Sequence, residues 1–318
     1  MTRVLVVHRG GASFARRDGR ILSAPDVDVH LVDVRRPSAV LRSAREAWRA
    51  DAVLSWFVSV HTVVPLVVAR LRGRPIVIIP GGYEVADAPE IPYGWRGSWW
   101  RRRAVALLLR NARQVLAVSP AIAECIEATA PGVHPTLVPN AIETPSDPGS
   151  PAGARGFDVA TSIISVDEPT RRLKGIDLFV GAARRLPGRR FLVVGDLDWP
   201  DLPPNVRVTG LLDPDAAECA LGDARVYVQL SRGSEAFGSA LLEAMARGAT
   251  PVVTDVGGLP WVVGDVGRVV PPDDVDAIVG AIESALADPR PDASTERALT
   301  EFSTARRRDG LREALELV

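Results

Sequence analysis

Lysine is almost absent from this chain of 318 residues, in which 37 of the 38 basic side chains are arginine and the other is Lys174. Cysteine is nearly as scarce, because Cys125 and Cys219 lie far apart without the close spacing of a metal or redox motif. This usage argues against a disulfide-stabilised scaffold and fits a reducing compartment. We expect both cysteines to be packing residues.

Long apolar runs and an excess of charge of one sign are also missing. The N-terminal MTRVLVVHRGG leads directly into a strand and is too short for a signal peptide or a membrane span. We therefore expect a cytoplasmic protein. The net charge of −1 gives no global reason to expect nucleic acid as a partner. At 47% hydrophobic residues, the chain is long enough to bury two cores.

Short apolar segments alternate with helix-length segments along both halves of the chain, which is the rhythm of βαβ units. The sequence predicts an α/β fold of two Rossmann-like domains, each a parallel sheet covered by helices. In the first half we expect strands over residues 3–8, 27–34, 52–57, 75–79, 114–118 and 136–138. In the second half we expect them over 157–166, 190–194, 205–208, 224–230, 250–253 and 267–270.

A stretch rich in proline, glycine and serine, residues 144–156, has the composition of a linker. We expect an N-terminal domain over 1–140, a linker over 141–156 and a second domain over 157–294. Residues 295–318 are predicted to form one charged amphipathic helix. The first crossover helix, over residues 12–21, is expected to be short because Gly19 interrupts it.

The most informative stretch, SRGSEAFGSALLEAMARG over residues 231–248, joins a buried strand to a glycine turn and a helix. The first amides of that helix, at Phe237, Gly238 and Ser239, have no helical acceptors and would attract a phosphate. Glu235 precedes the helix and Glu243 lies inside it, about 7 Å further along the axis. Carboxylates accept hydrogen bonds from sugar and ribose hydroxyls, so the pair suits one elongated ligand.

This spacing resembles the E-x7-E signature of glycosyltransferase family 4, whose members have the GT-B fold of two domains facing across a cleft. The resemblance implies that Glu235 contacts the donor sugar and Glu243 the nucleotide ribose. The Lys-Gly pair at Lys174 resembles the family's phosphate-binding Arg…Lys-Gly element, in which either Arg171 or Arg172 would accompany the lysine. The strand-ending glycines Gly195 and Gly210 would line the nucleotide pocket, and Gly10 and Gly11 resemble the paired glycines of the first domain.

The acceptor side is less specified. The turn Gly82-Tyr83-Glu84 resembles a family variant in which no histidine follows the strand, so a catalytic histidine cannot be assigned there. His8 and His61 follow apolar strands, and either could reach the predicted cleft or be a hydrogen-bonded structural residue. Trp261 stands where many relatives have glutamate.

The segment from Trp95 to Arg110 combines three tryptophans, five arginines and an aliphatic patch. This composition is typical of a helix at a membrane interface. It is also compatible with a helix that covers the sheet through residues 104–109. Peripheral contact with a membrane, at the inner face, is therefore one of two interpretations.

The resemblance implies a retaining glycosyltransferase that uses a nucleotide diphosphate sugar, with Lys174, Arg171, Arg172 and Glu235 at the reaction centre. We expect no cofactor and no metal site, because Asp196 and Asp198 fall in a turn and Asp274 caps a helix. The alternatives are a non-catalytic protein that binds nucleotide sugars and a membrane-surface enzyme with a lipid acceptor. The donor base and sugar, the acceptor and the oligomeric state are not specified.

Overall fold

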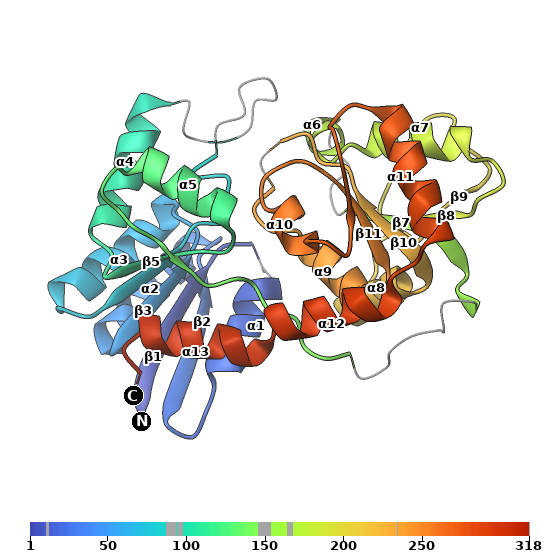
Figure 1. The fold of residues 1–318 in the computed structure, drawn as a ribbon. Coiled ribbons are helices and arrows are strands. Elements are labelled where there is room, and N and C mark those ends of the chain that lie inside the picture. Colours follow the sequence, from blue (N-terminus) through green and yellow to red (C-terminus); the bar gives the residue numbers. More distant parts are fainter. Residues whose placement is uncertain are drawn as a thin grey trace. The chain divides into compact units, whose positions relative to one another are not determined.

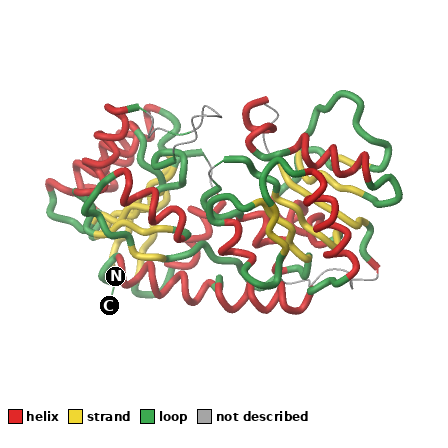
Figure 2. Tube along the Cα trace, turned by 45° about the horizontal axis from the view of Figure 1, so that its top comes forward, coloured by secondary structure: helices red, strands yellow, loops and turns green. Residues whose placement is uncertain are grey.

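The computed structural model of the chain describes residues 1–10, 13–86, 94, 98–145, 154–163, 168–233 and 235–317. These residues form two compact units. The first holds the described residues up to Ala141 together with those from Thr304 onward, and the second holds those from Ile142 to Ser303. Figure 1 traces both units along the chain, and Figure 2 shows strands bordered by helices in each.

The first unit is built on a six-stranded parallel sheet with the order β2-β1-β3-β4-β5-β6. Its strands are β1 (Thr2–His8), β2 (Val27–Asp33), β3 (Ala52–Trp56), β4 (Ile76–Ile79), β5 (Gln114–Ala117) and β6 (Thr136–Leu137). Its helices are α1 (Ser13–Leu22), α2 (Pro37–Arg49), α3 (Val60–Leu71), α4 (Trp99–Arg110), α5 (Pro120–Thr129) and α13 (Thr304–Ala314). Each strand lies where the apolar pattern predicted it.

Strand order determines which helices share a face of this sheet. The connection from β1 to β2 runs in one direction along the sheet, whereas those from β2 to β3, β3 to β4 and β4 to β5 run in the other. Because crossovers between parallel strands are right-handed, α2, α3 and α4 cover the face opposite to α1. In Figure 1, α2, α3 and α4 are grouped at the left of the unit, whereas α13 lies near α1.

Two expectations about helices were wrong. Gly19 does not interrupt α1, which continues to Leu22, because the missing side chain allows close packing. A Cβ at Gly19 would lie 2.6 Å from the Leu31 side chain of β2. The C-terminal segment is two helices, α12 (Pro291–Glu301) and α13, which break at Phe302, a buried residue whose carbonyl accepts a hydrogen bond from the Ile142 amide.

The second unit repeats the architecture, with the sheet order β12-β11-β10-β7-β8-β9 and parallel pairing throughout. Its strands are β7 (Phe157–Ile163), β8 (Phe191–Gly195), β9 (Val206–Val208), β10 (Ala224–Gln229), β11 (Thr250–Thr254) and β12 (Arg268–Val270). Besides α12, its helices are α6 (Glu168–Leu173), α7 (Ile176–Arg185), α8 (Pro214–Gly222), α9 (Ser239–Ala246), α10 (Leu259–Val263) and α11 (Val275–Ala287).

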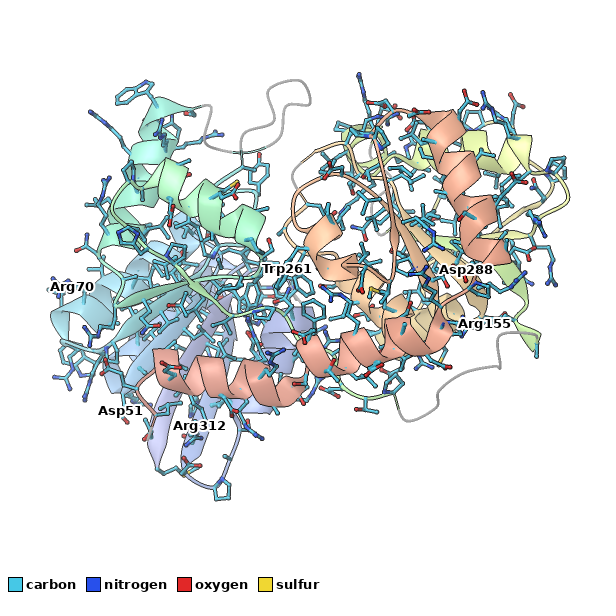
Figure 3. The ribbon with its side chains drawn as sticks, viewed as in Figure 1. Asp51, Arg70, Arg155, Trp261, Asp288 and Arg312 are labelled. Carbon is cyan, nitrogen blue, oxygen red and sulfur yellow. The ribbon has the colours of Figure 1, made fainter. Side chains whose placement is uncertain are left out.

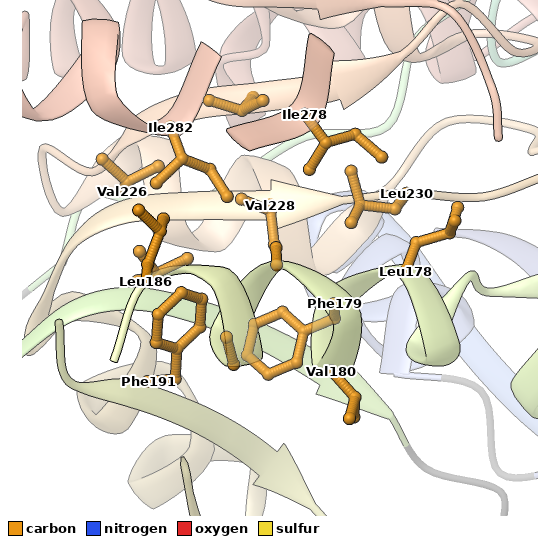
Figure 4. Packing of buried hydrophobic residues seen from close by; sticks show 14 of the residues in the cluster. Leu178, Phe179, Val180, Leu186, Phe191, Val226, Val228, Leu230, Ile278 and Ile282 are labelled. Atoms are coloured by element: carbon orange, nitrogen blue, oxygen red, sulfur yellow. The ribbon is translucent and has the colours of Figure 1, made fainter. Parts of the chain in front are cut away.

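Alternation along β10 divides its side chains between two layers. Val226, Val228 and Leu230 point into a core with Phe179 of α7 and Ile278 of α11, which Figure 4 shows in close-up. Tyr227 and Gln229 consequently lie on the other face of the sheet, the face that α9 covers. The buried side chains of Tyr227 and Gln229 therefore place polar groups on that face, whereas the opposite face is apolar.

Arg155 and Gly156, at the end of the expected linker, are held within the second unit. The Arg155 guanidinium is buried and donates to the carbonyl oxygens of Ala224, Arg247 and Gly248 at 2.7–3.1 Å. The Gly156 amide donates to the Asp223 carboxylate at 2.8 Å. Figure 3 labels Arg155 at this position. The chain is therefore anchored two residues before β7 begins.

Candidate functional site

Lys174 and Glu235, which the sequence placed in separate motifs, form an ion pair in the second unit. The Lys174 Nζ donates to Glu235 Oε2 at 2.5 Å. Ser231 Oγ donates to the same carboxylate oxygen at 3.2 Å. The Lys174 side chain is 34% exposed and that of Glu235 is 14% exposed, so the ammonium is accessible from one side. The pair combines a cation for a phosphate with an acceptor for hydroxyl groups.

Backbone conformation fixes the position of Lys174 at the junction of α6 and α7. Gly175, the next residue, has a φ of 66°, and a Cβ there would lie 1.9 Å from the Leu230 carbonyl oxygen. The junction therefore requires glycine, both for its left-handed conformation and for the close approach of Leu230, the residue after β10. This explains why a glycine follows the lysine.

Arg232, which the sequence analysis did not single out, holds this junction from the other side. Its amide donates to the Leu173 carbonyl at 2.8 Å, and its guanidinium donates to the Arg172 carbonyl at 3.0 Å. The guanidinium also binds both Asp177 oxygens at 2.6 Å and Asp273 at 2.5 Å. These carboxylates, Asp177 first, raise the pKa of Arg232. Its position three residues before Glu235 is the signal that could have identified it.

The two arginines proposed for the diphosphate differ in their surroundings. Arg171 donates to the Asp198 carbonyl at 2.5 Å and to Glu168 at 3.0 Å, and its guanidinium lies 5.9 Å from the Trp199 ring. The Arg172 side chain is exposed at the end of α6. Because Arg171 is engaged by its own unit, Arg172 is the one whose guanidinium is more readily available to a ligand.

The start of α9 is formed as the sequence predicted. Gly238 is its N-cap residue with a φ of 89°, Ser239 is its first residue and Phe237 is buried. Phe237 packs edge-on against Phe302, with ring centroids 5.3 Å apart. The buried Gln229 Oε1 has no hydrogen-bond partner among the described residues, and it would lie 3.3 Å from a Cβ at Gly238. A buried polar atom therefore lies close to the positive end of α9.

Glu243 lies on α9, and the charges of both Glu235 and Glu243 act on Tyr227. Burial, followed by these carboxylates, raises the pKa of the Tyr227 hydroxyl. That hydroxyl lies 2.8 Å from Ser162 Oγ of β7. The two glutamates of the signature thus both act on the Tyr227 hydroxyl of β10.

Two glycine turns complete this edge of the second sheet. Gly195 ends β8 with a φ of 125° and forms an antiparallel bridge with Gly210. A Cβ at Gly195 would lie 1.7 Å from the Ile163 carbonyl oxygen. Near α10, the Gly258 amide donates to the Glu235 carbonyl at 2.9 Å. The turn before Trp261 therefore supports the backbone of Glu235.

The residues expected on the acceptor side belong to the first unit. His8 ends β1, is 5% exposed and has no hydrogen-bond partner for Nδ1 among the described residues. Burial lowers the pKa of His8. The amide of Gly10, whose φ is 90°, donates to Asp33 at 3.3 Å. Gly11 lies outside the described residues, and so does the side chain of His61, which is the second residue of α3.

Glu84 is the most unusual group in the first unit. Its carboxylate is 3% exposed and accepts hydrogen bonds from the amides of Val58 at 2.8 Å and Gly81 at 3.2 Å. Burial raises the pKa of Glu84 to about 7, although these amides oppose the shift. Tyr83 is 41% exposed beside it, and Gly82 has a φ of 113°. Glu84 thus joins the ends of β3 and β4 instead of facing solvent.

Helix α4 shows both features expected of residues 95–110, of which 95–97 lie outside the described part. Val105, Ala106 and Leu109 are buried against the unit, whereas Trp99 and Trp100 are 72% and 55% exposed. Within the described residues, no helix is long and apolar enough to cross a membrane. The same residues contain no group of three or more histidine, cysteine, aspartate or glutamate side chains that could hold a metal ion.

Comparison with known proteins identifies a family model, curated relatives and solved structures that this chain resembles. Residues 161–288 match the sequence model of the family "Glycosyl transferases group 1". The chain is 27% identical over 277 residues to a component of the phosphatidylinositol N-acetylglucosaminyltransferase of Arabidopsis thaliana, covering 76% of this chain and 61% of that protein. It is 31% identical over 228 residues to D-inositol 3-phosphate glycosyltransferase of Mycobacterium avium, covering 65% and 53%.

A shorter match, 34% identical over 135 residues, is to phosphatidyl-myo-inositol mannosyltransferase of Mycolicibacterium smegmatis, covering 38% and 34%. The chain thus spans between about a third and three fifths of the length of these relatives. Anabaena HepE in complex with UDP-glucose has a TM-score of 0.78 at 17% identity, with both chains fully covered. Sucrose-phosphate synthase from Thermosynechococcus elongatus has a TM-score of 0.76 at 18% identity, covering 99% and 98%. The fold is that of these GT-B proteins, and the family match of residues 161–288 lies within the second unit.

Proposed function

We propose that this chain is a retaining glycosyltransferase that transfers a sugar from a nucleotide diphosphate sugar to an acceptor hydroxyl. The observation that carries the proposal is the Lys174–Glu235 pair beside the start of α9, with Glu243 on that helix. A cation, a helix N-terminus and two carboxylates are the groups that a diphosphate, a sugar and a ribose require. Structural neighbours crystallised with UDP and with UDP-glucose support a donor of this class.

In the proposed complex, the Lys174 ammonium binds the diphosphate. The backbone amides of Gly238 and Ser239 donate hydrogen bonds to the diphosphate oxygens. Glu235 accepts hydrogen bonds from sugar hydroxyls, and Glu243 accepts them from the ribose. Arg172, which is exposed, is the arginine that we assign to the diphosphate, whereas Arg171 stabilises the Asp198 turn. Donor binding thus exchanges an ion pair within the protein for ion pairs and hydrogen bonds with the ligand.

We propose that the reaction is a front-face displacement. The bond between the anomeric carbon and the diphosphate oxygen breaks while the acceptor oxygen attacks from the same face, and the acceptor proton passes to the leaving phosphate. Retention through a covalent intermediate would need a nucleophile and an acid about 5 Å apart across the sugar. Glu235 is paired with Lys174, and we assign no second carboxylate to that role. Lys174 then stabilises the charge that develops on the leaving diphosphate.

For the acceptor, we propose an inositol that carries a phosphate, either free or in a lipid. The support is that three relatives of this chain are named for phosphatidylinositol, phosphatidyl-myo-inositol and D-inositol 3-phosphate. Near the end of β1, Arg16 and Arg35 both act electrostatically on His8, and of the two only Arg35 is paired, with Asp33 at 2.8 Å, among the ion pairs of the described residues. We place the phosphate of the acceptor near these arginines.

The test is a thermal-shift panel of nucleotide sugars, followed by incubation of the stabilising donor with inositol 3-phosphate and with phosphatidylinositol. A ligand that binds only the folded state raises the melting temperature. We expect one class of nucleotide sugar to do so, and NMR of the product to show the anomeric configuration of the donor. An inverted product would contradict the displacement, and binding without transfer or hydrolysis of the donor would identify a non-catalytic binding protein.

A further inference from the structure

Helices α2 and α3 of the first unit carry exposed apolar side chains that the proposed reaction does not use. On α2, Leu41 is 77% exposed and Trp48, seven residues later and on the same side of the helix, is 57% exposed. On α3, Val64, Val67 and Leu71 are 38%, 48% and 78% exposed at the spacing of one helix face. Exposed apolar stripes on adjacent helices are uncommon in a protein without a partner surface.

The two stripes belong to one surface. Helices α2 and α3 pack against each other along their length, and the Arg72 guanidinium lies 4.8 Å from the Trp48 ring centroid. The opposite sides of both helices are buried, with Ala47 and Leu66 against the unit. The α2–α3 surface is defined by the five apolar residues above together with the exposed arginines Arg42, Arg45, Arg49, Arg70 and Arg72.

The charge of this surface is of one sign. Between Pro37 and Arg74 the sequence has six arginines and two acidic residues, Glu46 and Asp51, in a chain whose net charge is −1. Both acidic residues are engaged by arginines, Glu46 by Arg3 at 2.7 Å and Asp51 by Arg74 at 3.4 Å. Figure 3 labels Arg70 at the periphery of the unit. The arginines therefore give the α2–α3 surface a positive potential.

Helix α4 continues this character on the same face of the sheet, as the strand order requires. Trp99, Trp100 and Leu107 are 72%, 55% and 63% exposed. The guanidinium of Arg101 lies 5.1 Å from the Trp100 ring, and that of Arg103 lies 5.8 Å from the Trp99 ring. No acidic residue occurs in α4. Helix α4, on the same face of the sheet as α2 and α3, thus also presents tryptophan, leucine and arginine.

We infer that the first unit docks through the α2–α3 surface on a membrane that carries anionic lipids. Tryptophan rings favour the headgroup level, exposed aliphatic side chains enter the acyl boundary, and arginines bind lipid phosphates. The charge complementarity selects an anionic bilayer over an acidic or apolar protein, because the cations are spread over several helices instead of surrounding one pocket. The inference concerns the first unit alone and does not depend on the assignment of the donor site.

The experiment is sedimentation of the full chain with phosphatidylcholine vesicles that contain about a third phosphatidylglycerol, or none. We expect binding to the anionic vesicles only, weakening as salt is raised. Leu71→Asp should weaken the binding about ten-fold or more, because it removes apolar burial and adds a like charge to that of the lipid. Replacing Arg45, Arg49 and Arg70 together by glutamine should weaken it about a hundred-fold, at about five-fold for each arginine.

Matched controls carry the same changes elsewhere. Val269→Asp changes an exposed apolar residue of the second unit, and Arg184→Gln, Arg207→Gln and Arg308→Gln together remove three exposed cations outside the α2–α3 surface. Both controls should bind vesicles as the unsubstituted chain does, and all variants should keep the same melting temperature within a few degrees. The inference is overturned if the unsubstituted chain ignores anionic vesicles, or if the α2–α3 variants bind them unchanged. A dimer in light scattering that Leu71→Asp dissociates, without vesicle binding, would assign the surface to a second copy of the chain.

Discussion

The Arg307 guanidinium of α13 lies 2.7 Å from the Asp18 carboxylate of α1, and both side chains are almost fully buried at 1% and 4% exposure. Arg307 also donates to the carbonyls of Val138 and Pro139, and the Trp56 indole donates to Asp18 at 2.8 Å. The buried pair therefore joins the last helix of the chain to the first, within one unit.

Removal of Asp18 should destabilise the first unit strongly. Asp18→Ala leaves a buried guanidinium and an indole without their acceptor, which costs about 3–5 kcal/mol in free energy of unfolding. Urea unfolding followed by tryptophan fluorescence measures the loss. Asp309→Ala is the control, because its ion pair with Arg308 is exposed and should contribute about 0.5 kcal/mol or less. Equal midpoints for the two variants would refute a stabilising role for the Arg307–Asp18 pair.

Glu84 should make the stability of the first unit depend on pH near neutrality. Burial raises its pKa from 4.5 to about 7, so the folded carboxyl keeps its proton where the unfolded one has lost it. Its contribution to stability is therefore complete below about pH 4.5 and is lost as pH rises through 7. Between about pH 5 and about pH 8, the unsubstituted chain should lose about 3 kcal/mol relative to Glu84→Gln. Burial also lowers the pKa of His8, but its effect on stability is the same in the unsubstituted chain and in Glu84→Gln and cancels in the comparison.

Urea unfolding of the two proteins at several pH values measures this difference. The exposed Glu283→Gln variant is the control and should follow the unsubstituted chain at every pH. If Glu84→Gln also follows it, then Glu84 titrates in the folded protein as an ordinary surface carboxyl does.

Arg232 should act on turnover through Lys174, because its guanidinium holds the carbonyl of Arg172, two residues before the lysine. Arg232→Ala should lower kcat about ten-fold by displacing the ammonium from the diphosphate. In a Lys174→Ala background the same substitution should cost little, since residues that act together are not additive. Arg268→Ala, which also removes an ion pair of the second unit, is the control. Additive losses in the double variant would show that Arg232 acts independently of Lys174.

Glu243 should contribute to nucleotide affinity more than to turnover. Glu243→Gln exchanges an ionised acceptor for a neutral one and should weaken binding of the nucleoside diphosphate about ten-fold or more. Titration calorimetry measures the dissociation constant, with Glu283→Gln as a matched substitution on another helix of the same unit. An affinity unchanged by Glu243→Gln would contradict the ribose assignment.

The strands and the donor-side motifs were predictable because they depend on local sequence. Short apolar segments mark the strands of the described residues, and Gly238 predicted the start of α9. The wrong predictions concern tertiary contacts. Gly19 suggests a helix break in the sequence, whereas in the structure it allows the Leu31 side chain to pack closely against α1. The break at Phe302 depends on the packing of its ring with Phe237 and Trp261.

Several parts of the site arise from residues that carry no motif. Arg232 becomes important through Asp177 and Asp273, which are 55 and 41 residues away in sequence. The α2–α3 surface escaped sequence analysis because an amphipathic pattern does not reveal which apolar residues remain exposed. The roles of Arg171, His8 and Glu84 toward a ligand stay predictions, as does the cleft between the two domains.

The rate of sugar transfer by Lys174→Ala tests the central claim most directly, because the Lys174–Glu235 pair is the feature on which the donor assignment rests. With the donor that the thermal-shift panel selects, this variant should turn over about a hundred-fold more slowly, since it lacks the cation that meets the charge of the leaving diphosphate. Arg184→Ala, which removes an exposed cation of the same unit, should keep the normal rate. A Lys174→Ala protein that is folded and transfers sugar at the normal rate would contradict the account.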